Sequence, residues 1–287
     1  VYHKGDIFSL NGTKGYVYDC PVATMDASEN PRFINFMKMV DKYRKLGVRT
    51  NADNPDDAQK ALEFGAEGIG LFRIEHMFYG KNSEAPLAKL RKVIHTTTPS
   101  ERLQAILELE PYVKESVKAT MKVMNNKPVT FRLLDPPLHE FVPQTNDKQQ
   151  ELANELGISV EEIKKRGESL HEVNPMMGHR GVRLGISFPA LSEMQFRAIF
   201  EAAAELYNAG FDPRPEIMIP VTISVNELNF QKRICDKVHK DVEFKYDRDI
   251  PYLFGTMIEI PRAAILADRM ARTAQFFSFG TNDLTQM

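Results

Sequence analysis

FGTMIEIPRAAILADRMARTAQFFSFGTNDLTQM (Phe254–Met287) contains the clearest secondary-structure signal in the chain. The apolar run Pro251–Ile260 is rich in β-branched and aromatic residues and predicts a strand. Pro261–Ala274 has proline at a helix start and apolar residues at helical spacing, and Gln275–Gly280 is apolar again. A strand, a helix and a second strand in this order form a β-α-β unit, so we expect two parallel, buried strands.

Each of these two predicted strands ends in a carboxylate, Glu259 in MIEIP and Asp283 in GTNDL. The carboxyl ends of neighbouring parallel strands lie on the face where α/β folds place their chemistry. Two hard oxygen ligands, with room for water and substrate oxygens, suit Mg²⁺ better than zinc. The alternative is that one carboxylate caps a helix and the other pairs with an arginine, because structural ion pairs produce the same pattern.

Strand and helix signals alternate from Gly47 onwards. The earlier predicted strands are Gly47–Asp53, Glu67–Arg73, Pro128–Asp135, His179–Ser187 and Glu216–Val221. Together with the last two they make seven β-α alternations, which indicate an α/β (β/α)8 TIM-type barrel rather than an open doubly wound sheet. A closed barrel needs an eighth strand, so we expect the barrel to be truncated before its last strand.

The first 46 residues differ in texture from the rest of the chain. The pattern of residues 1–20 predicts short strands, with a hairpin turn at the Gly-rich sequence NGTKG. We interpret these residues as the end of a preceding β-containing domain. Residues 21–46 are a linker with the amphipathic helix Pro31–Leu46, which we expect to pack on the barrel domain, residues 47–287. The chain begins with Val1 and stops after a helix-start signal, so we expect it to be a piece of a longer protein.

Composition excludes several classes of protein. Of the 287 residues 43% are hydrophobic and 26% charged, as in ordinary globular domains, and the formal net charge of −2 predicts no nucleic-acid partner. Two cysteines, Cys20 and Cys235, do not make a disulfide framework and favour a reducing compartment. No apolar run has membrane-spanning length, so no membrane partner is predicted.

Arginines also gather at the predicted strand ends. They are Arg73, Arg132 (with Asp135 close behind), Arg180 and Arg183. A salt bridge within the barrel explains any single one of them. Their coincidence with Glu259 and Asp283 favours an anion site beside a cation site, where arginine forks hold phosphoryl oxygens and a metal holds the other end of a phosphorylated or enolic substrate.

Other candidate groups carry less information. His76, His139 and His179 are acid–base candidates, with a hydrogen-bonded structural role as the simpler interpretation. Cys235 lies in a helical pattern and is predicted to be a packing residue, and the thirteen methionines are most simply core residues.

Five motifs in order carry a family resemblance: Gly70–Phe78 (GLFRIEHMF), Phe131–Pro143, Asn174–Gly185, Gly255–Ala263 and Phe276–Met287. They resemble the C-terminal PEP/pyruvate-binding domain of the pyruvate, phosphate dikinase family, whose members are PEP-utilising enzymes. The resemblance covers about residues 20–287, and residues 1–20 resemble the end of the family's swivelling phosphohistidine domain. DPPLHEF and NPMMGHRG favour a dikinase over PEP synthase and enzyme I of the sugar phosphotransferase system.

The resemblance implies phosphotransferase chemistry. Pyruvate and PEP would be interconverted through an enolate, with the phosphoryl group exchanged with a phosphohistidine on another domain of the same chain, itself ATP-dependent. By resemblance Glu259 and Asp283 hold Mg²⁺, Arg73 and Arg132 clamp the phosphoryl group, and Arg180 stabilises the enolate oxygen. Gly280, Thr281 and Asn282 would orient phosphate and carboxylate, and a homodimer is implied.

Two family features are missing from this sequence. None of the seven histidines has the family's T-x-H setting of the phosphorylated histidine. The family's cysteine acid lies on the missing last strand, and neither Cys20 nor Cys235 matches it. We therefore expect the chain alone to be inactive in turnover, while binding PEP, pyruvate or oxalate with Mg²⁺.

Three other interpretations stay open. The chain could be a docking and dimerisation module without activity of its own, a PEP synthase-like enzyme, or a metal-dependent lyase or aldolase. The last needs metal carboxylates but not three phosphate-holding arginines. A cytoplasmic location is the default expectation, and the family also allows plastid or glycosome.

Overall fold

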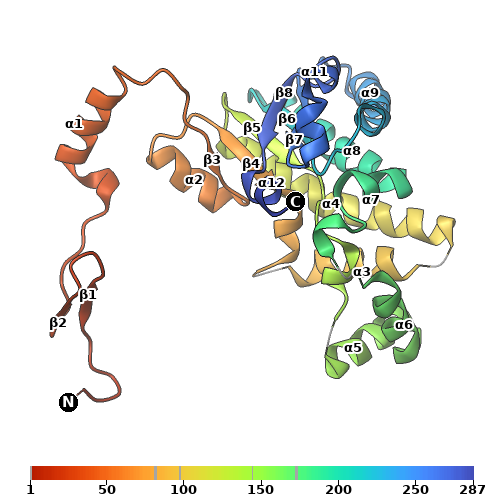
Figure 1. The fold of residues 1–287 in the computed structure, drawn as a ribbon, viewed down its shortest axis with the longest axis horizontal. Helices are drawn as coiled ribbons and strands as arrows, with labels where there is room; N and C mark the ends of the chain where they lie inside the picture. The colour runs from red at the N-terminus through yellow and green to blue at the C-terminus, as the bar shows by residue number, and fades with distance from the viewer. Residues whose placement is uncertain (1, 81–82, 97, 144, 172–173) are drawn as a thin grey trace. The chain divides into compact units, whose positions relative to one another are not determined.

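Six parallel strands form one curled, half-barrel sheet in the order β3-β4-β5-β6-β7-β8. This computed structural model describes residues 2–80, 83–96, 98–143, 145–171 and 174–287. The chain divides into two units, Val1–Gly47 and Val48–Met287, and the sheet lies in the second (Figure 1). Its strands are β3 (Thr50–Asn51), β4 (Ile69–Arg73), β5 (Pro128–Arg132), β6 (Arg214–Ile219), β7 (Leu253–Ile258) and β8 (Phe276–Phe279).

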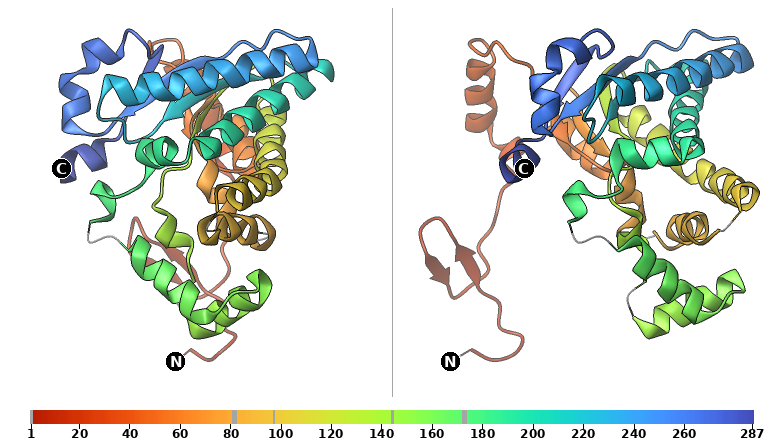
Figure 2. Two further views of the ribbon diagram at one scale, coloured as in Figure 1. Left: turned by 90° about the vertical axis from the view of Figure 1, so that its right-hand side faces the viewer. Right: turned by 45° about the vertical axis from the view of Figure 1, so that its right-hand side comes forward.

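Helices follow the strands, as the alternating pattern predicts. The α-helices of this unit are α2 (Pro55–Glu63), α3 (Glu84–His95), α4 (Pro99–Val123), α5 (Asn146–Leu156), α6 (Val160–Leu170), α7 (Gly181–Ser187), α8 (Pro189–Asn208), α9 (Val225–Tyr246), α10 (Pro261–Ile265), α11 (Ala267–Met270) and α12 (Thr281–Gln286). Short 3-10 helices are η2 (Ile74–Phe78), η3 (Leu138–Phe141) and η4 (Pro175–Met177). Helices α3, α4, α8 and α9 pack successively against one another (Figure 2).

The core lies between the sheet and these helices. Phe72, Phe131 and Phe254 from three strands are at most 1% exposed, as are Phe196 and Phe200 from α8. β7 is buried along five of its six residues and its β-branched and aromatic composition suits that environment. Burial of this apolar surface, at about 25 cal/mol per Å², is the main term that stabilises the unit.

Parallel pairing brings the carboxyl ends of the strands to one edge of the sheet. Arg73 at the end of β4 is in register with Arg132 at the end of β5, and Ile258 of β7 is in register with Phe279 of β8. The residues that follow these pairs, including Glu259 and Gly280, therefore emerge at the same edge. The predicted parallel β-α-β unit at the C-terminal end is confirmed.

The predicted fourth strand, His179–Ser187, is wrong. Residues Gly181–Ser187 form α7, and β5 pairs directly with β6, so the sheet has six strands where seven were expected. Gly181 and Gly185 are four residues apart on one helix face: a Cβ on Gly181 would lie 2.8 Å from Cγ2 of Val221, and one on Gly185 would lie 2.5 Å from Oγ of Ser192. Close packing selects the helix over the strand that the alternating apolar residues indicate.

The unit Val1–Gly47 contains a hairpin and one α-helix. β1 (Ser9–Asn11) and β2 (Tyr16–Tyr18) pair antiparallel, as the Gly-rich turn predicts. After η1 (Ala27–Glu29) comes α1 (Pro31–Val40), which is capped by Asn30. The Asn30 side chain accepts a hydrogen bond from the backbone N–H of Arg32. The assignments of residues 1–20, 21–46 and 47–287 to family domains stay predictions.

Within the described residues, the helices are too short or too polar to span a bilayer.

Candidate functional site

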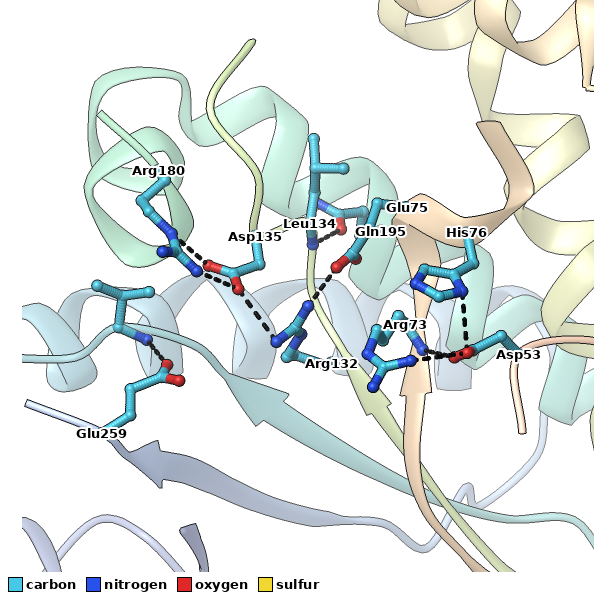
Figure 3. Close-up of polar contacts among 11 residues, drawn as sticks. Asp53, Arg73, Glu75, His76, Arg132, Leu134, Asp135, Arg180, Gln195 and Glu259 are labelled. Carbon is cyan, nitrogen blue, oxygen red and sulfur yellow. Dashed lines mark hydrogen bonds and ion pairs between the residues drawn. The ribbon is translucent and has the colours of Figure 1, made fainter. Parts of the chain in front are cut away.

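Four charged side chains form a continuous row at the carboxyl edge of the sheet (Figure 3). Arg180 binds Asp135 through two hydrogen bonds, Nε to Oδ1 at 3.1 Å and Nη2 to Oδ2 at 2.6 Å. Asp135 Oδ2 lies 3.0 Å from Nη1 of Arg132, and the Nη2 of Arg132 donates to Glu75. Asp135 and Glu75 are each 2% exposed, so these are buried ion pairs.

Electrostatic effects in this row act in opposite directions. Burial opposes the charged form of Arg132, yet the carboxylates of Glu75 and Asp135 raise its pKa above the usual value. Burial likewise opposes the charge on Arg180, and the hydrogen bonds to Asp135 raise its pKa. Burial raises the pKa of Glu75, an effect that Arg132 counteracts. Both guanidinium groups therefore stay charged inside a low-dielectric site.

A second cluster lies on β3 and β4 (Figure 3). Asp53 Oδ1 accepts the backbone N–H of Arg73 at 2.8 Å, and its Oδ2 lies 2.9 Å from Nη1 of Arg73 and 2.9 Å from Nδ1 of His76. Burial lowers the pKa of His76 despite the neighbouring Asp53 carboxylate. One carboxylate thus orients both side chains at the end of β4.

Glu259 is a buried carboxylate at the end of β7. It is 1% exposed, and its Oε1 accepts the backbone N–H of Val221 at 2.6 Å. Burial, reinforced by the negative charge of Asp135, raises the pKa of Glu259 to about 7. Val221 has a φ of 59°, an unfavourable conformation for a β-branched residue. Strain of this kind costs about 1–3 kcal/mol and often marks a functional site.

Gly280 packs directly against this carboxylate. A Cβ at Gly280 would lie 2.6 Å from Cβ of Glu259 and 2.8 Å from its Oε2. The backbone N–H of Gly280 donates to the carbonyl of Ile258 at 3.0 Å, and α12 begins at the next residue. Thr281 and Asn282 are exposed, and Asp283 is half-buried and interacts electrostatically with Arg180 and Glu259.

The charges of the strand-end cluster do not balance. It contains three arginines (Arg73, Arg132, Arg180) and five carboxylates (Asp53, Glu75, Asp135, Glu259, Asp283). With every group ionised, an excess of two negative charges remains, of the size that one divalent cation neutralises. Among the described residues no three His, Cys, Asp or Glu side chains converge as a metal-ligand set, so a metal here would need further oxygen ligands from water or substrate.

The structure brings the predicted site residues to one edge, with one correction. Arg73 and Arg132 end their strands as predicted. Arg180 does not end a strand, since it precedes α7 at the N-cap position. All three arginines form ion pairs, as the simpler interpretation of each expected. Glu259 accepts a hydrogen bond from Val221, and no arginine forms an ion pair with it among the described residues.

Of the weaker candidates, His76 contacts Asp53 in the second cluster, while His139, His179 and Cys235 contact other side chains. The His139 ring lies 5.8 Å from that of His171, and the His179 ring lies 5.8 Å from that of Phe188. Cys235 is fully buried and burial raises its pKa to about 12, which confirms a packing role for this thiol.

Sequence reasoning missed two carboxylates, Asp53 and Glu75. Both follow predicted strands, β3 and β4, so the rule that identified Glu259 would have found them. It also missed Gln195, whose Oε1 accepts the backbone N–H of Leu134 at 2.7 Å and fixes the chain between Arg132 and Asp135. No local sequence signal marks Gln195, because the partner lies 61 residues away.

A parallel half-barrel with charged residues at its carboxyl edge is a common architecture of α/β enzymes. The family described as "PEP-utilising enzyme, PEP-binding domain" matches residues 27–287. The chain therefore belongs to this family of PEP-utilising enzymes.

Its relatives within the family are pyruvate, phosphate dikinases. It is 47% identical over 288 residues to "Pyruvate, phosphate dikinase" of Clostridium symbiosum, covering 100% of this chain and 33% of that protein. It is 46% identical to "Pyruvate, phosphate dikinase" of Giardia intestinalis (99% of this chain, 32% of that protein). It is also 46% identical to "Pyruvate, phosphate dikinase 1, chloroplastic" of Arabidopsis thaliana (99% and 30%). The chain spans about a third of the length of these relatives.

Proposed function

We propose that this chain is the PEP- and pyruvate-binding part of a pyruvate, phosphate dikinase. The phosphoryl group would pass between pyruvate and a phosphohistidine supplied by another domain of a longer chain, and the present chain alone would not turn over. The observation that carries the proposal is the strand-end cluster, where three arginines lie along the same sheet edge as the Glu259 carboxylate, within a chain similar to dikinases over its whole length.

Mg²⁺ fits the residues present. Glu259 and Asp283 supply two hard oxygen donors, and with every group ionised the cluster has an excess of negative charge. We propose these two residues as the protein ligands. When bound, the ion would supply positive charge that stabilises negatively charged substrate oxygens.

The arginines would act as preorganised anion holders. In this proposal Arg73 and Arg132 hold the phosphoryl oxygens, and Arg180 stabilises the negative charge that builds on the pyruvate oxygen. Asp53 and Asp135 orient the guanidinium groups, so little side-chain entropy is lost when substrate binds. Gly280, Thr281 and Asn282, with backbone N–H groups at the start of α12, would orient phosphate and carboxylate.

Calorimetric titration with oxalate, a mimic of the pyruvate enolate, tests the proposed function. We expect oxalate to bind the chain in the presence of Mg²⁺ and to show at least a tenfold weaker affinity when EDTA replaces the ion. Binding that is indifferent to Mg²⁺ would contradict the metal assignment, and a complete lack of binding by a chain that is folded by circular dichroism would contradict the function.

Arg132→Ala is expected to weaken the binding of PEP more than that of pyruvate. The loss should be tenfold or more for PEP, because a charge-assisted hydrogen bond to the phosphoryl group contributes about 1.5–3 kcal/mol. Competition with oxalate measures both affinities. Arg214→Ala, an exposed arginine paired with Asp212, is the control and should change neither. Equal losses for PEP and pyruvate would remove the phosphoryl-holding role.

The proposal extends to assembly and location. A homodimer is part of it, and exposed Leu103 and Leu107, one helical turn apart on α4, offer an apolar contact surface (49% and 51% exposed).

The relatives from Arabidopsis thaliana and Mesembryanthemum crystallinum carry "chloroplastic" in their names, so a plastid location stands beside the cytoplasmic default.

A further inference from the structure

A groove of about 450 Å³ lies between the end of α3, the start of α4 and α6, and shares no lining residue with the strand-end cluster. Its volume is within the range of small-ligand sites. Its charged lining residues are Arg102, Lys165, Arg166 and the carboxylate Glu162, and His95 lies beside them. The hydroxyl-bearing residues Thr96 and Ser169 also line it.

The two arginines are held in place without carboxylates. Nη2 of Arg102 donates to the carbonyl of Thr96 at 2.9 Å, and its guanidinium lies 4.7 Å from the centre of the Phe188 ring. Nε of Arg166 donates to the carbonyl of Ile94 at 3.1 Å. Over the residues that the structure describes, neither arginine forms an ion pair, and Lys165 forms none either. Both forks are therefore oriented while their charge is not neutralised.

The carboxylate of Glu162 does not pair with these arginines. Glu162 lines the same groove, but its Oε2 accepts the backbone N–H and the hydroxyl of Ser159 in the capping box of α6. These bonds lower the pKa of Glu162 and keep it ionised as a cap.

His95 lines the groove and has a buried ring nitrogen, Nε2, without a hydrogen-bond partner among the described residues. This is an unfavourable state for a ring nitrogen. Burial, together with the charges of Arg166 and Arg91, lowers the pKa of His95 to about 4. Burial and the charge of Arg166 also lower the pKa of Arg102. An anion in the groove would relieve this mutual repulsion.

We propose that this groove is a second anion site, which binds a soluble phosphate or phosphate monoester between Arg102, Arg166 and Lys165, beside the His95 ring. Two oriented arginine forks suit the geometry of phosphate oxygens. The groove shares no lining residue with the strand-end cluster, so phosphate bound here would not occupy the proposed PEP site.

Nuclear magnetic resonance titration of the His95 ring with inorganic phosphate tests the site. The chain is titrated at constant pH and at ionic strength held constant with chloride, and His95→Gln assigns the resonance. We expect the His95 ring protons to shift saturably in the wild-type chain. The affinity should fall about tenfold in Arg102→Gln and again in Arg166→Gln, because each removes charge-assisted hydrogen bonds.

Two control variants separate this site from other phosphate binding. Arg269→Gln, an exposed residue of α11, should leave the titration unchanged. Arg132→Ala should also leave it unchanged, even if it abolishes PEP binding, so failure of this proposal is distinct from failure of the proposed function. The absence of a saturable His95 shift in the wild-type chain would overturn the proposal. So would equal affinities in all variants, or binding to phosphatidylglycerol vesicles without a response to soluble phosphate.

Discussion

Replacing Glu259 with glutamine is expected to abolish Mg²⁺-dependent oxalate binding and, at the same time, to stabilise the metal-free fold at pH 8. Glutamine keeps the size of the side chain and an oxygen that accepts the Val221 N–H, bonded at 2.6 Å in the wild type. It removes the negative charge that a divalent ion requires. Asp283→Ala is expected to lose the same oxalate binding, because two carboxylates are proposed to hold the ion.

The gain in stability follows from the raised pKa of Glu259. The pKa is about 7 in the folded chain against an unfolded value near 4.5. Between these values the folded state holds more protons, so the free energy of unfolding falls as pH rises from 4.5 to 7. At pH 8 Glu259 is ionised in the folded chain, and this buried charge lowers the free energy of unfolding by on the order of 3 kcal/mol for a shift of this size. Urea denaturation in EDTA at pH 5 and pH 8 measures it.

The control for this experiment is Glu63→Gln, an exposed carboxylate on α2. It should change neither oxalate affinity nor the pH dependence of unfolding. A Glu259→Gln chain that still binds oxalate with Mg²⁺ would contradict the metal assignment. A variant whose stability relative to wild type is the same at pH 5 and pH 8 would show that burial of this charge is not costly.

Local patterns were sufficient to place most of the candidate residues at one edge of the sheet. Arg73, Arg132 and Glu259 each end an apolar run whose composition predicts a strand, and parallel pairing then brings strand ends to one edge. The α/β prediction with one parallel sheet, carrying helices between strands, is confirmed for the same reason. These features depend on residues close in sequence, which is where composition and periodicity carry information.

The error at His179–Ser187 has a tertiary cause. Val182, Leu184 and Ile186 alternate with other residues and indicate a strand. In the folded chain the backbone N–H of Gly181 donates to the Asp135 carbonyl and that of Val182 to the Pro220 carbonyl, so the turn before α7 is tied to the ends of β5 and β6. These partners are distant in sequence, and only the glycine pair Gly181 and Gly185 hinted at a closely packed helix face.

The ion-pair partners of the arginines could not be predicted from the sequence for a related reason. The sequence shows that Arg132 and Arg180 are charged residues near strand ends, but not that both bind Asp135. That choice depends on side-chain geometry across β5 and the turn before α7. The resemblance to dikinases assigned roles to the arginines, while the structure adds the carboxylates that hold them.

Replacing Asp135 with asparagine is expected to destabilise the fold by about 3–5 kcal/mol, since removing one partner of a buried ion pair leaves an uncompensated charge. Asp135 is 2% exposed and is the only ion-pair partner of Arg180 among the described residues. Asparagine preserves the shape and one acceptor oxygen, so the loss reports charge rather than packing. Urea denaturation at pH 7 measures the change in the free energy of unfolding.

Asp212→Asn is the matched control for Asp135→Asn. Asp212 pairs with Arg214 at 2.8 Å, but the two side chains are 41% and 56% exposed, so the expected loss is below about 1 kcal/mol. A double-mutant cycle of Asp135→Asn with Arg180→Gln should show a coupling of about 1–3 kcal/mol, because the second substitution removes the unpaired charge left by the first. Equal effects at Asp135 and Asp212, or a cycle without coupling, would contradict the view that Asp135 holds the arginines in place.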